Sequence, residues 1–335
     1  MSIRSSTPLD APALDDLYRG IRPKLDKVEA VLRGWSDSQN PLVNEISRYV
    51  LHERGKMIRP ALVLLGARLL GAADEEDVFL AALVEVVHTA GIIHDDIVDD
   101  ARERRGRESI HARWGPNVTV LIGDYLYIKS IGLSLRSKHE RVIRVVAELS
   151  AKMIEGELAE VAACGDLALT EPAYLDILEK KTASLFEACC LFSAILAAAS
   201  DDAEAALSKY GRELGMCFQI VDDLLDFTGD PRVLGKPVLS DLREGRITLP
   251  VIRALAQDGR ELRPRLQGLV RRRTIPARES RAVVERLRAC GALEETFAAA
   301  RDHADRAKSH LAAFPDTEFR RALVGLADFA LHRSR

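Results

Sequence analysis

Apolar and polar residues along the chain recur with the period of an α-helix from near the N-terminus to the C-terminus. Most long segments place apolar residues three and four positions apart, and the alternation that marks β-strands is nearly absent. Ala, Leu, Glu and Arg, which all favour helices, are abundant. We therefore predict an all-α fold.

Residues that begin or end helices divide this pattern into segments. Pro60 suits a first helical turn, and Gly71 and Gly165 suit helix ends. No Pro-, Gly- or Ser-rich linker interrupts the chain, so we predict a single all-α domain over residues 1–335, built as one large helical bundle. Its predicted helices, followed by further ones to the C-terminus, cover residues 9–34, 39–54, 60–70, 75–101, 117–136, 139–163, 171–199, 201–228 and 248–257.

Two apolar runs approach the length of a membrane span. Val78–Ile93 contains Glu85 and His88, and Ala183–Ser200 contains Glu187. A spanning helix needs about 20 predominantly apolar residues. We interpret both runs as central helices of the bundle, apolar all round because other helices cover them on every side.

Composition excludes some classes of function. The 335 residues carry a net charge of −3, so no basic surface points to nucleic acid. Five cysteines, an odd number without metal-type spacing, indicate a reduced protein without a disulfide framework. The N-terminal segment lacks the apolar core of a signal peptide. We therefore expect a cytoplasmic protein.

Two acidic clusters stand near the ends of apolar helical segments. Carboxylates in such helices are costly unless they are paired or bind a metal. Oxygen ligands with no cysteine nearby favour Mg²⁺ or Mn²⁺. The competing interpretation is a solvated acidic face plus a salt-bridged helix, which explains one cluster more readily than two. Both clusters have the spacing i, i+1, i+4, with Asp95, Asp96 and Asp99 in the first and Asp222, Asp223 and Asp226 in the second.

Basic residues lie in short motifs around these clusters. Each of them taken alone is more often a solvated surface charge. Converging on the aspartates, they would form a pocket of alternating sign that suits a diphosphate. The basic residues in question are Lys56, Arg59, Arg104, Arg105, Lys181 and Lys236.

In order along the chain, the motifs resemble those of the trans-isoprenyl (polyprenyl) diphosphate synthases. The resemblance covers roughly residues 50–255 and is highly specific, because it rests on many motifs in one order. It implies an isoprenoid-synthase bundle with a central apolar cavity, a prenyltransferase activity and a homodimer. The motifs are GKMIRP, EVVHTAGIIHDDIVDDARERRG, GDYLY, EGEL, KTASLF, CFQIVDDLLDFTGD and GKPVLSDLREGRITLP.

The resemblance also implies a role for each site residue. The six aspartates would hold a Mg²⁺ cluster on the allylic diphosphate, which Arg104, Lys181 and Lys236 would also contact. Isopentenyl diphosphate would bind Lys56, Arg59, His88 and Arg105, although a histidine like His88 is by itself more often a core residue. Thr182 and Gln219 would lie near the reacting carbon, so the predicted catalytic residues are Lys181, Thr182, Gln219 and Lys236.

Two positions depart from the commoner family pattern. Arg246 stands where Lys is usual, which keeps the charge. Glu160 stands where Gln is common, and the sequence offers no account of it. The basic C-terminal LHRSR would either fold over the isopentenyl-diphosphate site or be disordered.

Small residues before the first acidic cluster bear on product length. In the family, large side chains four or five positions before this motif block long products, and here those positions hold Gly91 and Ala90. Val87 and then Phe79 follow on the same helix, and Phe79 would close the floor of the tunnel unless Tyr127 closes it earlier. The resemblance therefore implies a medium-to-long-chain product of the kind used for quinone side chains. Alternatively, these small residues merely let helices pack closely.

Parts of the sequence pattern also fit four other functions. A short-chain synthase making farnesyl or geranylgeranyl diphosphate would use the same chemistry. A class I terpene cyclase would not need the isopentenyl-diphosphate residues, and an HD-type hydrolase would leave the second acidic cluster unexplained. A regulatory subunit without activity would be expected to have lost motif residues, whereas both clusters are whole. Transient membrane contact during product release is a further expectation.

Overall fold

A computed structural model describes residues 13–36, 38–51, 55–72, 74–104, 107–229, 238–272 and 275–333. The predicted substrate contacts Arg105 and Lys236 lie outside these residues. Arg104 lies in a short strand, β1.

Helices make up nearly all of the regular structure, and the prediction of an all-α fold is confirmed. In the described part of the chain, the strands are limited to an antiparallel hairpin of β1 (Glu103–Arg104) and β2 (Arg107–Glu108). The helical elements are α1 (Leu14–Leu17), η1 (Arg19–Ile21), α2 (Arg22–Gly34), α3 (Pro41–Leu51), α4 (Ile58–Leu69), α5 (Glu76–Val98), α6 (Ile110–Trp114), α7 (Pro116–Ser134), α8 (Arg141–Ala162), α9 (Glu171–Leu178), η2 (Glu179–Ala183), α10 (Ser184–Leu196), α11 (Asp201–Thr228), α13 (Ser240–Glu244), α14 (Leu249–Arg272), α15 (Ala277–Ala289), α16 (Ala292–His310), η3 (Leu311–Ala313) and α17 (Glu318–His332).

Two of the predicted helices are interrupted. The segment predicted as helix 9–34 contains the short α1 and a 3₁₀ turn, η1, before α2 begins. The segment predicted as helix 171–199 contains η2, a π-helical turn, between α9 and α10. Such turns break the regular hydrogen-bond ladder without an apolar signature, and they are frequent at functional sites.

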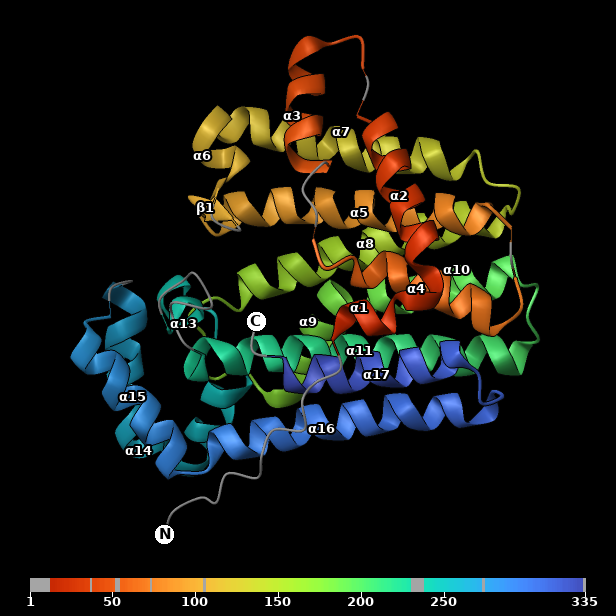
Figure 1. The fold of residues 1–335 in the computed structure, drawn as a ribbon. Coiled ribbons are helices and arrows are strands. Elements are labelled where there is room, and N and C mark those ends of the chain that lie inside the picture. The colour runs from red at the N-terminus through yellow and green to blue at the C-terminus, as the bar shows by residue number, and fades with distance from the viewer. Residues whose placement is uncertain are drawn as a thin grey trace.

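The bundle brings the two acidic clusters to the same end of the molecule. Helix α5 packs on α4 and α7, α10 packs on α4 and α11, and α11 packs on α16. Figure 1 shows the C-terminal ends of α5 and α11 on the same side, near the β1 hairpin and α13 respectively. The segments that carry the two acidic clusters therefore lie on one side of the bundle.

Helix α5 is a core helix. By length and composition it is the one described helix able to cross a membrane, and 67% of its apolar window is buried by the rest of the protein. Leu80 and Leu83 have no exposed surface. This burial accounts for its apolar composition.

Candidate functional site

A cavity of about 1550 Å³ lies between the N-terminal end of α4 and helices α5, α7, α8, η2, α11 and α13. Its lining combines charged side chains with apolar ones such as Ile154, Leu158 and Leu185. It brings together most of the residues predicted from the sequence, namely Lys56, Arg59, His88, Gly91, Asp95, Asp99, Lys181, Thr182, Gln219, Asp222, Asp223 and Asp226.

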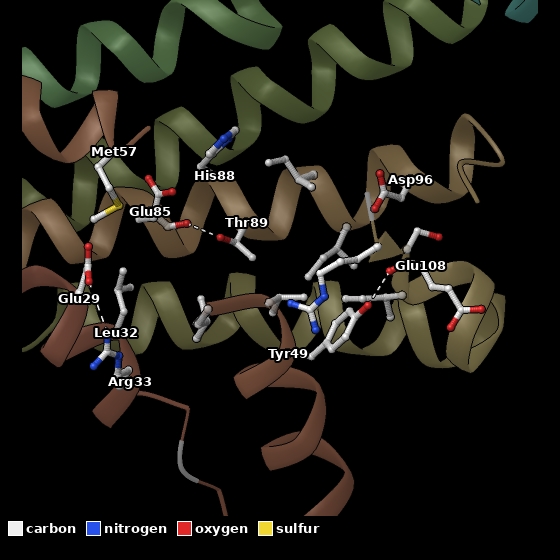
Figure 2. Close-up of a pocket in the computed structure, with 17 residues that line it drawn as sticks. Glu29, Leu32, Arg33, Tyr49, Met57, Glu85, His88, Thr89, Asp96 and Glu108 are labelled. Carbon is white, nitrogen blue, oxygen red and sulfur yellow. Dashed lines mark hydrogen bonds and ion pairs between the residues drawn. The ribbon is translucent and has the colours of Figure 1, made fainter. Parts of the chain in front are cut away.

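Asp96 does not line this cavity, although it was predicted beside Asp95 and Asp99. Successive residues of a helix are rotated by about 100°, so Asp95 and Asp99 share a face that Asp96 does not. Asp96 is 5% exposed and lines an adjacent, smaller cavity of about 220 Å³, which shares Glu85, His88 and Ile92 with the larger one. Figure 2 shows this smaller cavity, with Glu85 and Thr89 on the same helix.

The first acidic cluster is joined to the region after the second by Arg246. Its guanidinium forms ion pairs with Asp99, with Asp241 (Nη2–Oδ1 2.9 Å) and with Glu244. Burial opposes the charge of Arg246, but the three carboxylates more than offset it and raise the pKa of the guanidinium. Because guanidinium nitrogens form a planar fork, one arginine can bridge two segments where a lysine would offer a single point charge.

The carboxylates of the second cluster are each engaged by a different partner. Asp222 is half-exposed and pairs with Arg333 at 2.8 Å. Asp226 is buried and accepts hydrogen bonds from the backbone N–H groups of Ser240 (3.1 Å) and Asp241 (3.2 Å) and from the Ser240 hydroxyl. Asp226 thus satisfies the first N–H groups of α13, as a capping residue does.

Asp223 is buried and accepts hydrogen bonds from two side chains. The Tyr174 hydroxyl donates to its Oδ2 at 2.5 Å, and Gln219 Nε2 donates to its Oδ1 at 2.9 Å. Gln219 is oriented in turn by the Thr182 hydroxyl, which donates to its Oε1 at 3.0 Å. Burial and the negative charges of Asp241 and Asp222 raise the pKa of Asp223 to about 8.

Lys181 lies on the π turn η2 and faces α8. Its Nζ is 2.6 Å from Glu157 and 2.5 Å from Glu160. Burial opposes the charge, but Glu160, Asp95 and Glu157 outweigh it and raise the pKa of Lys181. Glu160, unexplained from the sequence, is therefore an ion-pair partner of a predicted catalytic lysine.

Gly156 of the EGEL motif allows the π turn to approach α8. A Cβ at this position would lie 2.6 Å from the backbone nitrogen of Lys181, well inside van der Waals contact. Because residue 156 has no side chain, the backbone at Lys181 can approach α8 this closely.

The GKMIRP motif begins α4 and supplies a basic corner of the cavity. Met57 adopts the left-handed conformation (φ 52°), which costs a non-glycine residue energy and often occurs at functional sites. Arg59 Nη1 lies 2.9 Å from His88 Nε2. Lys56 Nζ lies 5.1 Å above the ring of Phe329, so α17 contributes to this corner.

Of the four residues predicted to set product length, Gly91 alone lines the cavity. Ala90 and Val87 are buried among helices, and Phe79 packs edge-on against Trp35 with ring centroids 5.2 Å apart. A Cβ on Gly91 would lie 3.2 Å from Met153 Cε and 3.5 Å from the Tyr127 hydroxyl oxygen, both of cavity-lining residues. Helices α7 and α8 therefore make the wall opposite Gly91, and the roles of the four residues stay predictions.

The donor set fits a metal shared with a ligand better than a metal held by protein alone. Among the described residues, no three Asp, Glu, His or Cys side chains form a ready-made metal site. Mg²⁺ commonly takes one or two carboxylates and completes its octahedron with water and phosphate oxygens. Asp95, Asp99 and Asp222 line the same cavity and offer such oxygens.

The sequence analysis assigned no role to Tyr174 or Ser240, which contact the second acidic cluster. It expected the C-terminal LHRSR over the isopentenyl-diphosphate site or disordered, whereas Arg333 of this segment pairs with Asp222 of the second cluster. No spacing or periodicity links Tyr174 or Arg333 to this cluster. Such partners become visible in the folded arrangement.

Comparison with known proteins identifies close relatives. The family model described as polyprenyl synthetase matches residues 40–287. The chain is 37% identical over 312 residues to octaprenyl diphosphate synthase of Escherichia coli strain K12, covering 92% of this chain and 95% of that protein. Polyprenyl synthase of Caulobacter crescentus, in complex with calcium and isoprenyl diphosphate, superposes with a TM-score of 0.92 at 34% identity, over 98% of this chain and all (100%) of that one. Decaprenyl diphosphate synthase of Rhodobacter capsulatus gives a TM-score of 0.90 at 36% identity, covering 96% and 100% of the two chains.

Proposed function

Because the chain belongs to the polyprenyl synthetase family, we propose that it condenses isopentenyl diphosphate head-to-tail with a farnesyl or geranylgeranyl diphosphate primer. It is a prenyltransferase and a medium-to-long-chain all-trans polyprenyl diphosphate synthase. We further propose the farnesyl or geranylgeranyl primer, the residue roles given below and a product used for quinone side chains.

One observation carries this assignment: a single large cavity joins both acidic clusters, the basic GKMIRP corner and Lys181. An allylic diphosphate would lie between the two clusters, with Lys181 beside its oxygens. Isopentenyl diphosphate would lie against Lys56, Arg59 and His88. Apolar side chains from α8 and α10 also line the cavity. With substrates bound against them, they would help to exclude water, which would otherwise quench a carbocation.

The reaction then follows from charge. Mg²⁺, when bound with the diphosphate, would stabilise the negative charge on the leaving group. The C–O bond of the allylic diphosphate breaks and leaves an allylic cation. The double bond of isopentenyl diphosphate attacks this cation, and a proton passes to the released diphosphate. Lys181 and Arg104 would hold the allylic diphosphate by ion pairing, and Arg59 would hold isopentenyl diphosphate in the same way.

A second copy of the chain is the proposed protein partner. Helix α7 exposes large apolar side chains, including Val120, Leu121 and Ile128. A two-fold contact of α7 with its own copy would cover this patch. Residence in the cytoplasm, with membrane contact limited to product release, completes the proposal.

A product assay tests the function directly. Purified protein receives Mg²⁺, isopentenyl diphosphate and farnesyl diphosphate, and the dephosphorylated products are sized by reversed-phase chromatography with mass detection. A ladder ending well beyond geranylgeraniol is the expected result. A short single product would favour the short-chain alternative, and consumption of farnesyl diphosphate without isopentenyl incorporation would favour a terpene cyclase.

A further inference from the structure

Arg333 reaches the second acidic cluster from the C-terminal end of the chain. It follows α17 directly, and its Nη2 lies 2.8 Å from Asp222 Oδ1. The same nitrogen donates to the carbonyl oxygen of Phe218 at 2.5 Å, and the guanidinium carbon lies 3.5 Å above the Phe218 ring. The side chain of Arg333 is 4% exposed.

This contact is not an optimal structural ion pair. The Nε of Arg333 is buried without a hydrogen-bond partner, which leaves one charged donor unsatisfied. The carboxylate of Asp222 is 44% exposed and lines the cavity. Burying a guanidinium costs desolvation free energy, and its ion pair with one half-exposed carboxylate offsets this cost only in part.

The contact places a positive charge beside a group of carboxylates that repel one another. Asp222, Asp223, Asp226 and Asp241 all line the same cavity, so four carboxyl groups lie close to one another there. A positive charge at Asp222 lowers the repulsion among these groups. Arg333 supplies such a charge through its ion pair with Asp222.

We propose that the guanidinium of Arg333 occupies the site of a divalent cation at Asp222, and that it is displaced when metal and diphosphate bind. This inference rests on the proposed role of Asp222 as a metal ligand. An arginine and a divalent cation repel each other at a common carboxylate, so the two alternatives compete. The position of Arg333 favours exchange, because it lies beyond the last helical residue of α17 in extended backbone (ψ 145°) and can withdraw without unwinding a helix.

Calorimetry with three variants tests the competition. Mg²⁺ is titrated into protein saturated with inorganic diphosphate, using wild type, Arg333→Gln, Arg333→Lys and, as the matched control, Arg321→Gln. Arg321 lies on α17, the helix that precedes Arg333, but pairs with Asp316 at 3.1 Å. We expect apparent Mg²⁺ affinity to rise about three- to thirtyfold in Arg333→Gln, the range typical of coupling between contacting groups. Arg333→Lys should fall between Arg333→Gln and wild type, and Arg321→Gln should match wild type.

Thermal unfolding separates this role from a structural one. In EDTA, Arg333→Gln should lower the Tm, and Mg²⁺ with inorganic diphosphate should raise it by more than in wild type. An equal drop with and without ligand, or unchanged or weaker Mg²⁺ binding in Arg333→Gln, would overturn the proposal. Absence of Mg²⁺ binding by every variant would overturn it as well, whereas isopentenyl incorporation in the product assay judges the enzymatic function separately.

Discussion

At the residue scale, two neighbouring aspartates of the first acidic cluster have different surroundings. Asp95 faces the large cavity, and Asp96 faces the smaller one. Helical rotation turns position i+1 away from positions i and i+4. The spacing alone did not decide the outcome, because Asp222, Asp223 and Asp226 have the same spacing on α11 and all line the large cavity. The residue types were predictable from the sequence, whereas the cavity that each residue lines depends on how the neighbouring helices pack.

Substitution should separate the two aspartates. We expect Asp95→Asn to reduce the steady-state rate of isopentenyl incorporation by about a hundredfold or more, since it removes charge stabilisation where the diphosphate leaves. Asp96→Asn should cost much less, because its carboxylate lines the other cavity. Equal losses in two variants with wild-type circular dichroism would contradict this assignment.

Asp223 predicts a pH dependence of stability. Its pKa, raised from 3.8 to about 8, means that the folded state binds a proton more tightly than the unfolded state. Its contribution to the free energy of unfolding is therefore full below about pH 4 and is lost as pH rises towards 8. In EDTA, urea unfolding of Asp223→Asn should show a flatter pH dependence than wild type over this window. An unchanged slope would show that Asp223 does not carry the effect.

At the scale of elements, the sequence predicted which segments are helical but not where they depart from regular geometry. The predicted helix 201–228 coincides with α11 (Asp201–Thr228). The π turn η2 was missed, because its residues have no distinctive apolar period and its shape depends on packing against Gly156. Local pattern thus predicts an element, and contact with another helix decides its local form.

Gly156 can be tested against a glycine with free space. Gly156→Ala should destabilise the protein by about 1–3 kcal/mol in urea unfolding, the usual cost of overpacking, and should also slow the reaction because Lys181 is displaced. Gly268→Ala on α14 is the control: nothing lies within 4 Å of its added Cβ. In that helical position alanine should stabilise by about 0.5–1 kcal/mol. Equal effects of the two substitutions would argue against the close approach.

The wall opposite Gly91 gives an element-scale prediction about product length. Gly91→Phe should shorten the product ladder, because its ring enters the cavity beside Tyr127 and Met153. Ala90→Phe should instead destabilise the protein, because Ala90 is fully buried and does not line the cavity. Product sizing together with thermal unfolding distinguishes the two effects. Shortening by Ala90→Phe at unchanged Tm would restore the tunnel as predicted from the sequence.

At the scale of the whole molecule, the order of motifs predicted the contents of the site better than its internal contacts. Residues from the GKMIRP, EGEL, KTASLF and second aspartate motifs meet in one cavity, as the resemblance implied. The partners Tyr174 and Arg333 come from outside these motifs, and the fold alone brings them to Asp223 and Asp222.

The exposed apolar face of α7 predicts the assembly state. Leu121 and Ile128 are each 68% exposed on this helix. The double variant Leu121→Asp with Ile128→Asp should halve the mass measured by light scattering, because charge cannot be buried in an apolar two-fold contact. A wild-type protein that is already monomeric, or a variant that remains dimeric, would reject this interface.

The bonds made by Asp226 have a consequence for chain entropy. Its backbone carbonyl accepts a hydrogen bond from the N–H of Leu239, and its carboxylate accepts hydrogen bonds from Ser240 and Asp241. One residue of α11 therefore holds the start of α13 close to α11. Closing a loop restricts the chain at a cost that these bonds offset. Any cation drawn to the Asp226 carboxylate competes with the backbone for the same oxygens. Ligand binding and the attachment of α13 to α11 are thereby linked through a single side chain.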